Sequence, residues 1–265
     1  MKWSTNSSFP YGQMVSTQSV NFGLAGLKRR GGWPDDYAKR IGAVQDLEPW
    51  LQNLIQESVA SADQLKGRKV RVLDAGAGPI SKIGNRMMDV DLEVIAADPL
   101  ALIYDELLQK FQITPCVRTQ FAPAEDLSAF FQPSIFDLVN CTNALDHSFE
   151  PVRGLIEMLR VVKVGAPVFL AHNRNEAVNE NYEGFHQFNF DVIDGRFVIW
   201  NKTEHWVVEE HIPIEVEIVN TLKNNWVTNT LVKRSEFSDV DDHQRRDRRL
   251  RDIYRQFMAV MSEAR

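Results

Sequence analysis

One segment constrains the fold of this chain more than any other. Residues 70–79 read VRVLDAGAGP, an apolar, β-branched run that ends in an acid and two closely spaced glycines. The run has the length and composition of a buried strand. Gly76 and Gly78 allow a tight turn and a close approach of a ligand to the main chain. Helical spacing is predicted over 80–88, so the segment indicates a strand, a turn and a helix that together bind a nucleotide-like ligand.

The same alternation continues through residues 69–172. Continuous apolar runs predict buried strands, and apolar residues at steps of three and four predict helices between them. Strands are expected at 69–75, 92–97, 136–141 and 167–171, and helices at 80–88, at 100–111 and from Pro151 toward Gly165. This order predicts an α/β fold, a Rossmann-like, mostly parallel sheet with helices on both faces.

The flanking regions have other patterns. Residues 34–65 carry apolar side chains mostly at helical steps, with a break near Pro49, so an N-terminal helical cap is expected. The pairs Asp194-Gly195 and Asn224-Asn225 each separate two strand-like runs, which is the signal of a β-hairpin. Residues 241–265 are densely charged with apolar residues at helical steps and predict an amphipathic helix.

Four parts are therefore expected along the chain. They are an N-terminal segment with a helical cap (1–66), a ligand-binding core (67–173), a strand-rich antiparallel part that completes the sheet (174–238) and a C-terminal helix (239–265).

Composition narrows the partners. The 265 residues are 44% hydrophobic and 25% charged, the usual mixture for a folded globular protein. A net charge of −6 argues against a phosphate backbone, so nucleic acid is not an expected partner. Two cysteines, no signal-like segment and no long apolar run predict a cytoplasmic protein without membrane contact. The oligomeric state stays open, a homodimer included.

Asp74 indicates which nucleotide-like ligand to expect. It lies two residues before Gly76, where a carboxylate repels a pyrophosphate but pairs well with the ammonium of a methionine moiety. The dinucleotide fingerprint would also place a third glycine where this chain has Ser81. These residues favour S-adenosylmethionine (SAM) over NAD.

Asp98 ends the second predicted strand, about twenty residues after the glycines. An acid at this place can accept hydrogen bonds from both ribose hydroxyls of a nucleotide. The alternative is a turn residue before Pro99.

Four motifs in this order resemble the class I SAM-dependent methyltransferases, over roughly residues 68–173. They are LDAGAGP, AADP, APAEDL at 122–127, and FDLVNCTNALDH followed by EMLRVVKVGAPVFLAHN. The resemblance implies SAM as the cofactor and S-adenosylhomocysteine as the product.

The resemblance also implies which residues contact SAM. Those at the methionine end are Asp74, Gly76 and Gly78, with the adjoining Ala75 and Ala77; Asp98 with Pro99 serves the ribose, and Ala124 with Glu125 the adenine. An acid often found in the family at position 123 is Pro123 here, so adenine recognition is expected from backbone groups and from Glu125 or Asp126. Asn143 is expected to contact cofactor or acceptor. Tyr37 and Arg40 of the cap are candidates to cover the methionine carboxylate, and a solvated helix face explains them almost as well.

Histidines are the candidates for proton transfer. SAM carries the reactive sulfonium, so the protein has to place a nucleophile in line with the methyl group and manage one proton. His147 follows a predicted parallel strand at the edge where open α/β sheets build their sites, and it is the first candidate for a catalytic base. His186 in GFHQFNF is the second and His172 a weaker third. The alternatives are a backbone-bonded loop histidine for His147 and a packed hairpin for His186.

No metal site is predicted. Asp146 and His147 are contiguous, and neighbours in sequence rarely point at one ion without further ligands.

The acceptor is expected to be a small molecule. Residues 173–190 interleave Asn, Glu, His and Tyr with aromatic residues, which suits a hydroxyl-rich molecule. We expect O-methylation of a sugar, a nucleotide sugar or a glycan precursor, and the DHSFEP loop and the first hairpin look similar to methyltransferases of bacterial surface-sugar pathways. Two other classes stay open, a SAM- or nucleotide-binding module without turnover and an NAD-dependent oxidoreductase. Convergence of His147 and His186 in the fold separates an enzyme from the binding module.

Overall fold

The computed structural model describes residues 43–59 and 62–238 of the chain. Tyr37, Arg40 and the helix predicted over 241–265 lie outside the described residues.

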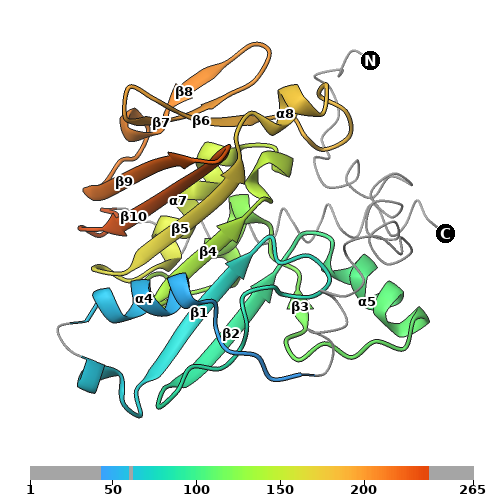
Figure 1. Ribbon diagram of the computed structural model, residues 1–265, viewed down its shortest axis with the longest axis vertical. Coiled ribbons are helices and arrows are strands. Elements are labelled where there is room, and N and C mark those ends of the chain that lie inside the picture. The colour runs from blue at the N-terminus through green and yellow to red at the C-terminus, as the bar shows by residue number, and fades with distance from the viewer. Residues whose placement is uncertain (1–42, 60–61, 239–265) are drawn as a thin grey trace.

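Seven strands form the main sheet in the order β3-β2-β1-β4-β5-β10-β9 (Figure 1). The five strands from β3 to β5 are parallel, and β10 runs antiparallel to both β5 and β9. Their bounds are β1 (Lys69–Ala75), β2 (Asp91–Ala97), β3 (Thr119–Gln120), β4 (Leu138–Thr142), β5 (Pro167–Asn173), β9 (Val216–Lys223) and β10 (Trp226–Lys233). The order of the first five is that of a doubly wound Rossmann sheet, and it reverses between β1 and β4, the topological switch point. The predicted fold class is confirmed.

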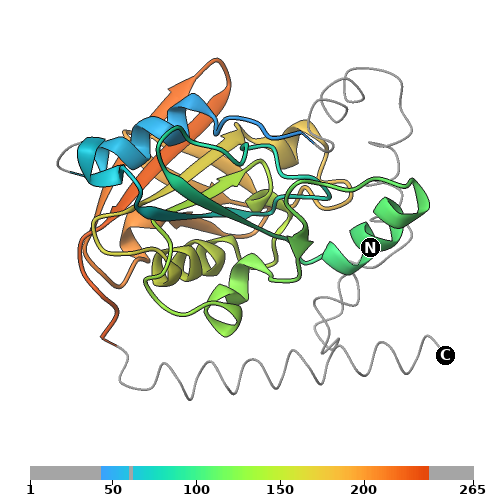
Figure 2. The ribbon, with the colours of Figure 1, turned by 90° about the horizontal axis from the view of Figure 1, so that it is seen from below.

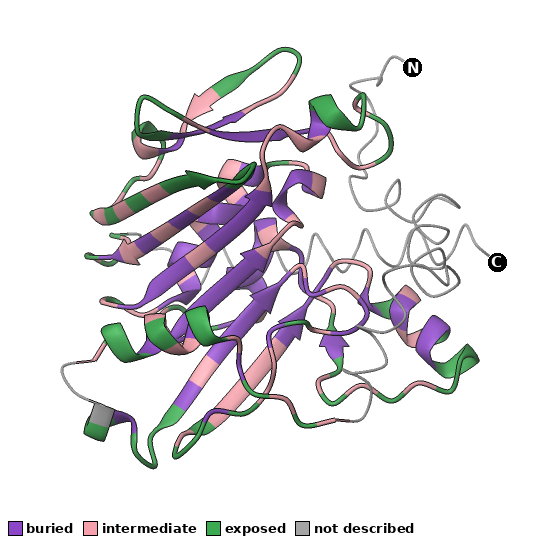
Figure 3. Cartoon of the chain, viewed as in Figure 1, coloured by how far each residue is buried: buried purple, intermediate pink, exposed green. Residues whose placement is uncertain are grey.

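The central strands are buried because both faces of the sheet are covered. Six of the seven residues of β1 are buried or half-buried, whereas the edge strand β9 alternates half-buried and exposed residues (Figure 3). A strand covered on both sides needs an almost continuous apolar run, which is the pattern that the sequence shows for β1, β4 and β5.

Helices lie on both faces (Figure 2). On one face, α4 (Pro49–Glu57) places Leu51 in a core cluster with Val72 of β1. On the other, α7 (Pro151–Val161) places Leu155 in a cluster with Leu73, the next residue of β1, whose side chain points to the opposite face. The remaining helical segments are α5 (Ala101–Lys110), α6 (Leu127–Phe130), α8 (Glu176–Asn179) and the 3-10 turns η1 (Ala62–Leu65), η2 (Ala124–Asp126), η3 (Leu145–His147) and η4 (Val208–Glu210).

A second, three-stranded antiparallel sheet precedes the last hairpin. It contains β6 (Asn189–Ile193), β7 (Arg196–Trp200) and β8 (His205–Val207), and it packs Phe190 and Phe197 into the α7 side of the core. Both predicted hairpins form, and all four turn residues have positive φ, between 51° and 79°. This is the geometry of type I′ turns, which Asn, Asp and Gly favour. Of the two hairpins, β9–β10 extends the main sheet and β6–β7 starts the separate one.

Two helical predictions are wrong. Residues 80–88 contain no helix, and residues 43–48 contain none either, so that α4 starts only at Pro49, where a proline is well tolerated. The two segments pair with each other, because Leu47 N donates to Arg86 O at 2.7 Å and Arg86 N donates to Gln45 O at 2.9 Å. Tertiary contacts thus satisfy the backbone groups that helices would have satisfied internally.

Candidate functional site

Ala124 and Glu125 follow β3 and His186 precedes β6, whereas the other predicted site residues that the structure describes lie at or shortly after the carboxyl ends of β1, β2, β4 and β5. This is the edge of the sheet around the switch point, where ligands bind in open α/β folds.

The glycine turn joins β1 to its neighbours on both sides. Gly76 N and Ala77 N donate to Ala97 O at 2.8 and 3.1 Å, which ties the end of β1 to the end of β2. A Cβ on Gly76 would lie 2.3 Å from Cβ of Ala144, whereas a Cβ on Gly78 would meet nothing within 4 Å. Both glycines have positive φ. Gly76 therefore allows close packing on the loop after β4, and Gly78 borders open space.

Asp74 is held inside the protein. Asp74 is 4% exposed, and its carboxylate accepts hydrogen bonds from Ser81 Oγ and Asn140 Nδ2, both at 2.7 Å. Ser81 stands where a dinucleotide site would have its third glycine, and here it fixes the acid instead. Sequence reasoning missed Asn140, although a polar residue within the apolar run of β4 was a signal for it. A direct contact of Asp74 with an ammonium group stays a prediction.

Asp98 connects β2 to the glycine turn. It accepts hydrogen bonds from Gly78 N at 3.1 Å and from Leu100 N at 2.8 Å. Burial raises the pKa of this carboxyl to about 6, although both N–H donors oppose the rise and the nearby charge of Asp74 adds to it. The bond to Leu100 is that of a turn residue, and the bond to Gly78 places the acid beside the glycine turn. A contact of Asp98 with a ribose stays a prediction.

The residues predicted to border adenine are more enclosed. Glu125 is 4% exposed and accepts a hydrogen bond from Phe149 N at 2.8 Å, and burial raises the pKa of its carboxyl. Asp126 binds Arg153 of α7 at 2.7 Å. Ala124 lies next to Gly154, also in α7. Both acids thus hold the start of α7, and their contact with adenine stays a prediction.

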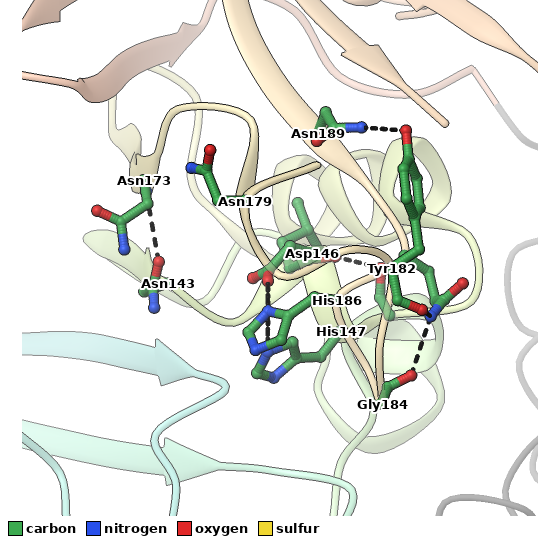
Figure 4. A network of polar contacts seen from close by, with 12 residues as sticks. Asn143, Asp146, His147, Asn173, Asn179, Tyr182, Gly184, His186 and Asn189 are labelled. Atoms are coloured by element: carbon green, nitrogen blue, oxygen red, sulfur yellow. Dashed lines mark hydrogen bonds and ion pairs between the residues drawn. The ribbon is translucent and has the colours of Figure 1, made fainter. Parts of the chain in front are cut away.

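Asn143 links the ends of β4 and β5. It has a φ of +49°, its N–H donates to Ala171 O at 2.7 Å, and its Oδ1 accepts from Asn173 N at 3.3 Å (Figure 4). Its side chain therefore lies at the same edge as the glycine turn.

The two predicted histidines converge, and they do so on an acid. His147 lies in η3, after β4, whereas His186 comes from the segment before β6 (Figure 4). His147 Nε2 lies 3.1 Å from His186 Nδ1. Asp146 Oδ2 lies 2.9 Å from His186 Nδ1 and 3.3 Å from His147 Nε2. We call these three residues the Asp-His-His cluster.

Burial and neighbouring charges shift the pKa values of all three residues of the Asp-His-His cluster. Burial lowers the pKa of His147, and the Asp146 carboxylate only partly offsets this. Burial also acts to lower the pKa of His186, but the hydrogen bond to Asp146 and the charges of Asp146, Glu176 and Glu180 outweigh it, so the net pKa is raised. Burial acts to raise the pKa of Asp146, yet the hydrogen bond from His186 and the surrounding histidines bring it below its ordinary value.

His172 lies beside this cluster at the end of β5. It is 1% exposed and its ring stacks on Phe190, with 4.2 Å between ring centroids. Neither ring nitrogen has a hydrogen-bond partner among the described residues, and the same holds for Asp146 Oδ1. Burial lowers the pKa of His172 to about 4. This end of the sheet thus contains buried polar atoms without partners from the described part of the chain.

Comparison with known proteins yields distant likenesses. No protein-family model and no curated protein matches the chain. Among solved structures, it is similar to a SAM-dependent methyltransferase from Clostridium acetobutylicum, at 12% identity and a TM-score of 0.40 over 75% of this chain and 96% of that one. Phosphoethanolamine N-methyltransferase 2 of Haemonchus contortus, in complex with SAM, is 13% identical with a TM-score of 0.43, and the match covers 84% of this chain and 58% of that one.

A third likeness is to the YcgJ protein of Bacillus subtilis, at 17% identity and a TM-score of 0.36 over 70% of this chain and 98% of that one. One fold carries many chemistries, so likenesses of this size establish neither a reaction nor a substrate for this chain.

Within the described residues, no helix has both the length and the apolar character that crossing a lipid bilayer requires.

Proposed function

We propose that this protein is a SAM-dependent methyltransferase that transfers the methyl group to a hydroxyl of a polar small molecule, such as a sugar, a nucleotide sugar or a glycan precursor. The observation that carries the proposal is the construction of the glycine turn. Acids flank the turn in Asp74 and Asp98, Gly78 borders open space, and no helix follows within residues 79–90.

The same construction argues against the rival NAD-dependent oxidoreductase. A dinucleotide places its pyrophosphate on the N-terminus of the helix after the turn, where free N–H groups and the helix dipole stabilise it. Here the chain after Gly78 is irregular, and two carboxylates lie close by. SAM has no phosphate and carries a positive sulfonium, so it needs no such helix and gains from nearby negative charge.

In this proposal Asp98 accepts hydrogen bonds from the ribose hydroxyls, and the main chain around Gly78 lies against the methionine part of SAM. Ala124 borders the adenine, and Asn143 faces cofactor or acceptor. Because Asp74 already accepts two internal hydrogen bonds, its main contribution is to fix the turn and to supply negative potential.

The Asp-His-His cluster serves the acceptor. Its loop packs on the glycine turn through Ala144 and Gly76, which brings the two halves of the site together. In the transfer, a lone pair of the acceptor oxygen forms the new bond to the methyl carbon. The carbon–sulfur bond breaks with its electrons going to sulfur, giving S-adenosylhomocysteine. The hydroxyl proton leaves through His147 or His186, which lie within hydrogen-bond distance of each other and of Asp146.

A screen of acceptors tests the proposal. The purified chain is incubated with SAM and with pools of sugars, nucleotide sugars and other hydroxyl-rich metabolites, and S-adenosylhomocysteine release and the mass gain of one methyl group are measured. We expect methylation of a hydroxyl compound that is lost in the double variant His147→Ala, His186→Ala. SAM binding without turnover on any pool would instead favour the non-catalytic binding module.

A further inference from the structure

We propose that the Asp-His-His cluster is a binding site for a divalent first-row transition-metal ion, held by Asp146 Oδ2, His147 Nε2 and His186 Nδ1. Together these atoms offer one carboxylate oxygen and two imidazole nitrogens from two separate segments of the chain.

The spacing of the three atoms is that of ligands on one ion. They form a nearly equilateral triangle with sides of 2.9, 3.1 and 3.3 Å. Metal–ligand bonds of about 2.1 Å place neighbouring ligands about 3.0 Å apart in an octahedral site and about 3.4 Å apart in a tetrahedral one. All three observed sides lie at or close to this interval.

Hydrogen bonding explains the triangle less well. Each nitrogen can carry one proton toward the cluster, so at most two N–H groups are available for three short contacts, and both would converge on the single oxygen Oδ2 of Asp146. The other oxygen of that carboxylate, Oδ1, is buried and has no hydrogen-bond partner among the described residues. A cation in the middle of the triangle lets all three atoms direct lone pairs at one centre.

The donor set and its surroundings fix the class of ion. Two imidazoles with one carboxylate suit Zn²⁺, Fe²⁺, Co²⁺ and related ions, whereas Mg²⁺ and Ca²⁺ prefer sites made of oxygen alone. The charges of Glu176 and Glu180 act on His186 in addition to that of Asp146, so the surroundings are negative. Three protein ligands leave at least one coordination position open, and the His147 side chain is 28% exposed.

An open position gives the ion a role that rests on the proposed function. An acceptor hydroxyl bound there becomes more acidic, as water does on Zn²⁺. With the ion in place, the two ligating nitrogens no longer accept a proton, so the hydroxyl proton passes to solvent water. The oxygen then attacks the methyl carbon of SAM as described above, and the ion replaces the histidine base.

Metal titration of the untagged chain tests the site without any acceptor or SAM. Protein freed of metal with a chelator is titrated with Co²⁺, which is followed by its visible absorption, and with Zn²⁺, which is followed by calorimetry. We expect one ion per chain, with nitrogen ligation evident in the Co²⁺ spectrum. His186→Ala and His147→Ala should each weaken metal binding by about 100-fold or more. Loss of a residue that only hydrogen-bonds a metal ligand already lowers metal affinity by about 10–100-fold, and loss of a ligand itself should cost at least as much.

Controls separate ligation from folding. His211→Ala removes an exposed histidine outside the cluster and should leave metal affinity unchanged. Thermal unfolding in the presence and absence of Zn²⁺ should show stabilisation of the wild type and of His211→Ala but not of His147→Ala, a variant that loses a partly exposed side chain. The proposal would be overturned if the wild type does not bind Co²⁺, or if His147→Ala and His186→Ala both bind it as tightly as the wild type.

The outcomes also distinguish this site from the proposed function. If the ion binds at these residues but no acceptor is methylated, the metal site is supported and its proposed role in methyl transfer is not. If an acceptor is methylated equally well by chelator-treated protein that binds no Co²⁺, the proposed metal site is wrong and the proposed methyltransferase activity is supported.

Discussion

The two halves of the site differ in how their polar groups are satisfied. At the glycine turn, each of the acids Asp74 and Asp98 accepts two hydrogen bonds from neighbouring residues. Across the switch point, His172 and Asp146 Oδ1 are buried without hydrogen-bond partners among the described residues, and three ligand-type atoms crowd together in the Asp-His-His cluster. In the proposed function, the first half is therefore organised before SAM binds, whereas a bound ligand would supply the missing partners of the second.

This contrast has an energetic meaning. A buried polar atom without a partner costs roughly 1–3 kcal/mol of folding free energy. Such a cost is tolerated where a ligand later supplies the partner, which is why strained or unsatisfied groups gather at functional sites. Substitutions on the two sides should therefore separate cofactor binding from turnover.

The largest effect is expected at the cluster. His147→Ala and His186→Ala should each lower turnover by about 100-fold or more, because each removes either a proton-transfer group or a ligand of the proposed metal ion. The Kd for SAM should change by less than about twofold, since Asp98 and Gly78 are untouched. Single-turnover kinetics and SAM calorimetry on the same preparations measure both, with the exposed His211→Ala as the matched control. A loss of SAM affinity equal to the loss of turnover would show that the two halves do not act separately.

Alanine substitutions of Gly76 and Gly78 should also separate an effect on stability from an effect on SAM binding. Gly76→Ala forces a Cβ to 2.3 Å from Ala144 at a φ of +71°, so we expect a loss of about 3 kcal/mol in the free energy of unfolding. Gly78→Ala carries only the strain of its positive φ, about 1 kcal/mol, but it fills the open space and should weaken SAM binding more than it lowers stability. Urea unfolding and SAM titration of both variants check this order. Equal destabilisation by the two substitutions would contradict it.

The carboxyl of Asp98 should lower the stability of the ligand-free protein at neutral pH, although it is proposed to strengthen SAM binding. Burial raises the pKa of its carboxyl from 3.8 to about 6, so the folded state keeps a proton that the unfolded state has lost, and stability falls as pH rises between these values. The shift corresponds to at most about 3 kcal/mol. Asp98→Asn should therefore stabilise the ligand-free protein at pH 8, by less than this limit because the amide oxygen replaces only one of two accepting oxygens.

The stabilisation of the Asp98→Asn variant should decrease as pH is lowered from 6 toward 4. Asp91→Asn, at the exposed start of β2, the strand that Asp98 follows, is the control. Unfolding free energies across this pH range decide the point, and a gain in Asp98→Asn that does not change with pH would refute the role assigned to burial.

His172 should give the smallest effect. Replacing it with Phe keeps a ring that can stack on Phe190 and removes two buried nitrogens without described partners, so stability should rise by about 1 kcal/mol. Thermal unfolding measures the change, with the exposed His205→Phe as control. If His172→Phe is instead destabilised by more than about 1 kcal/mol, the imidazole of His172 has a hydrogen-bond partner, and the contrast between the two halves of the site is smaller.

Local signals account for most of what the sequence predicted correctly. β1 was predicted with its bounds because an apolar run stands between a charged residue and a glycine turn, and both hairpins followed from Asp-Gly and Asn-Asn pairs that favour positive φ. His147 and His186 were both named as candidates because each follows a predicted strand of the sheet, and the structure brings them together.

Non-local contacts account for what was missed. Ile80, Ile83 and Met87 have helical spacing and are buried as a helix face would be, yet their segment is held by backbone pairing with residues 45–48, which no local pattern reveals. Asp146 was set aside as a ligand because its neighbour in sequence alone cannot complete a site. His186, which would complete the proposed metal site, lies forty positions away from Asp146.

Binding of nucleotides to the ligand-free protein tests the central claim most directly. Calorimetry is run with SAM, with S-adenosylhomocysteine and with NAD, on the wild type and on Asp98→Ala. We predict that both SAM species bind, that NAD does not, and that Asp98→Ala weakens SAM binding by about 10–100-fold through the loss of hydrogen bonds to a charged group. Tight binding of NAD without binding of either SAM species would contradict it.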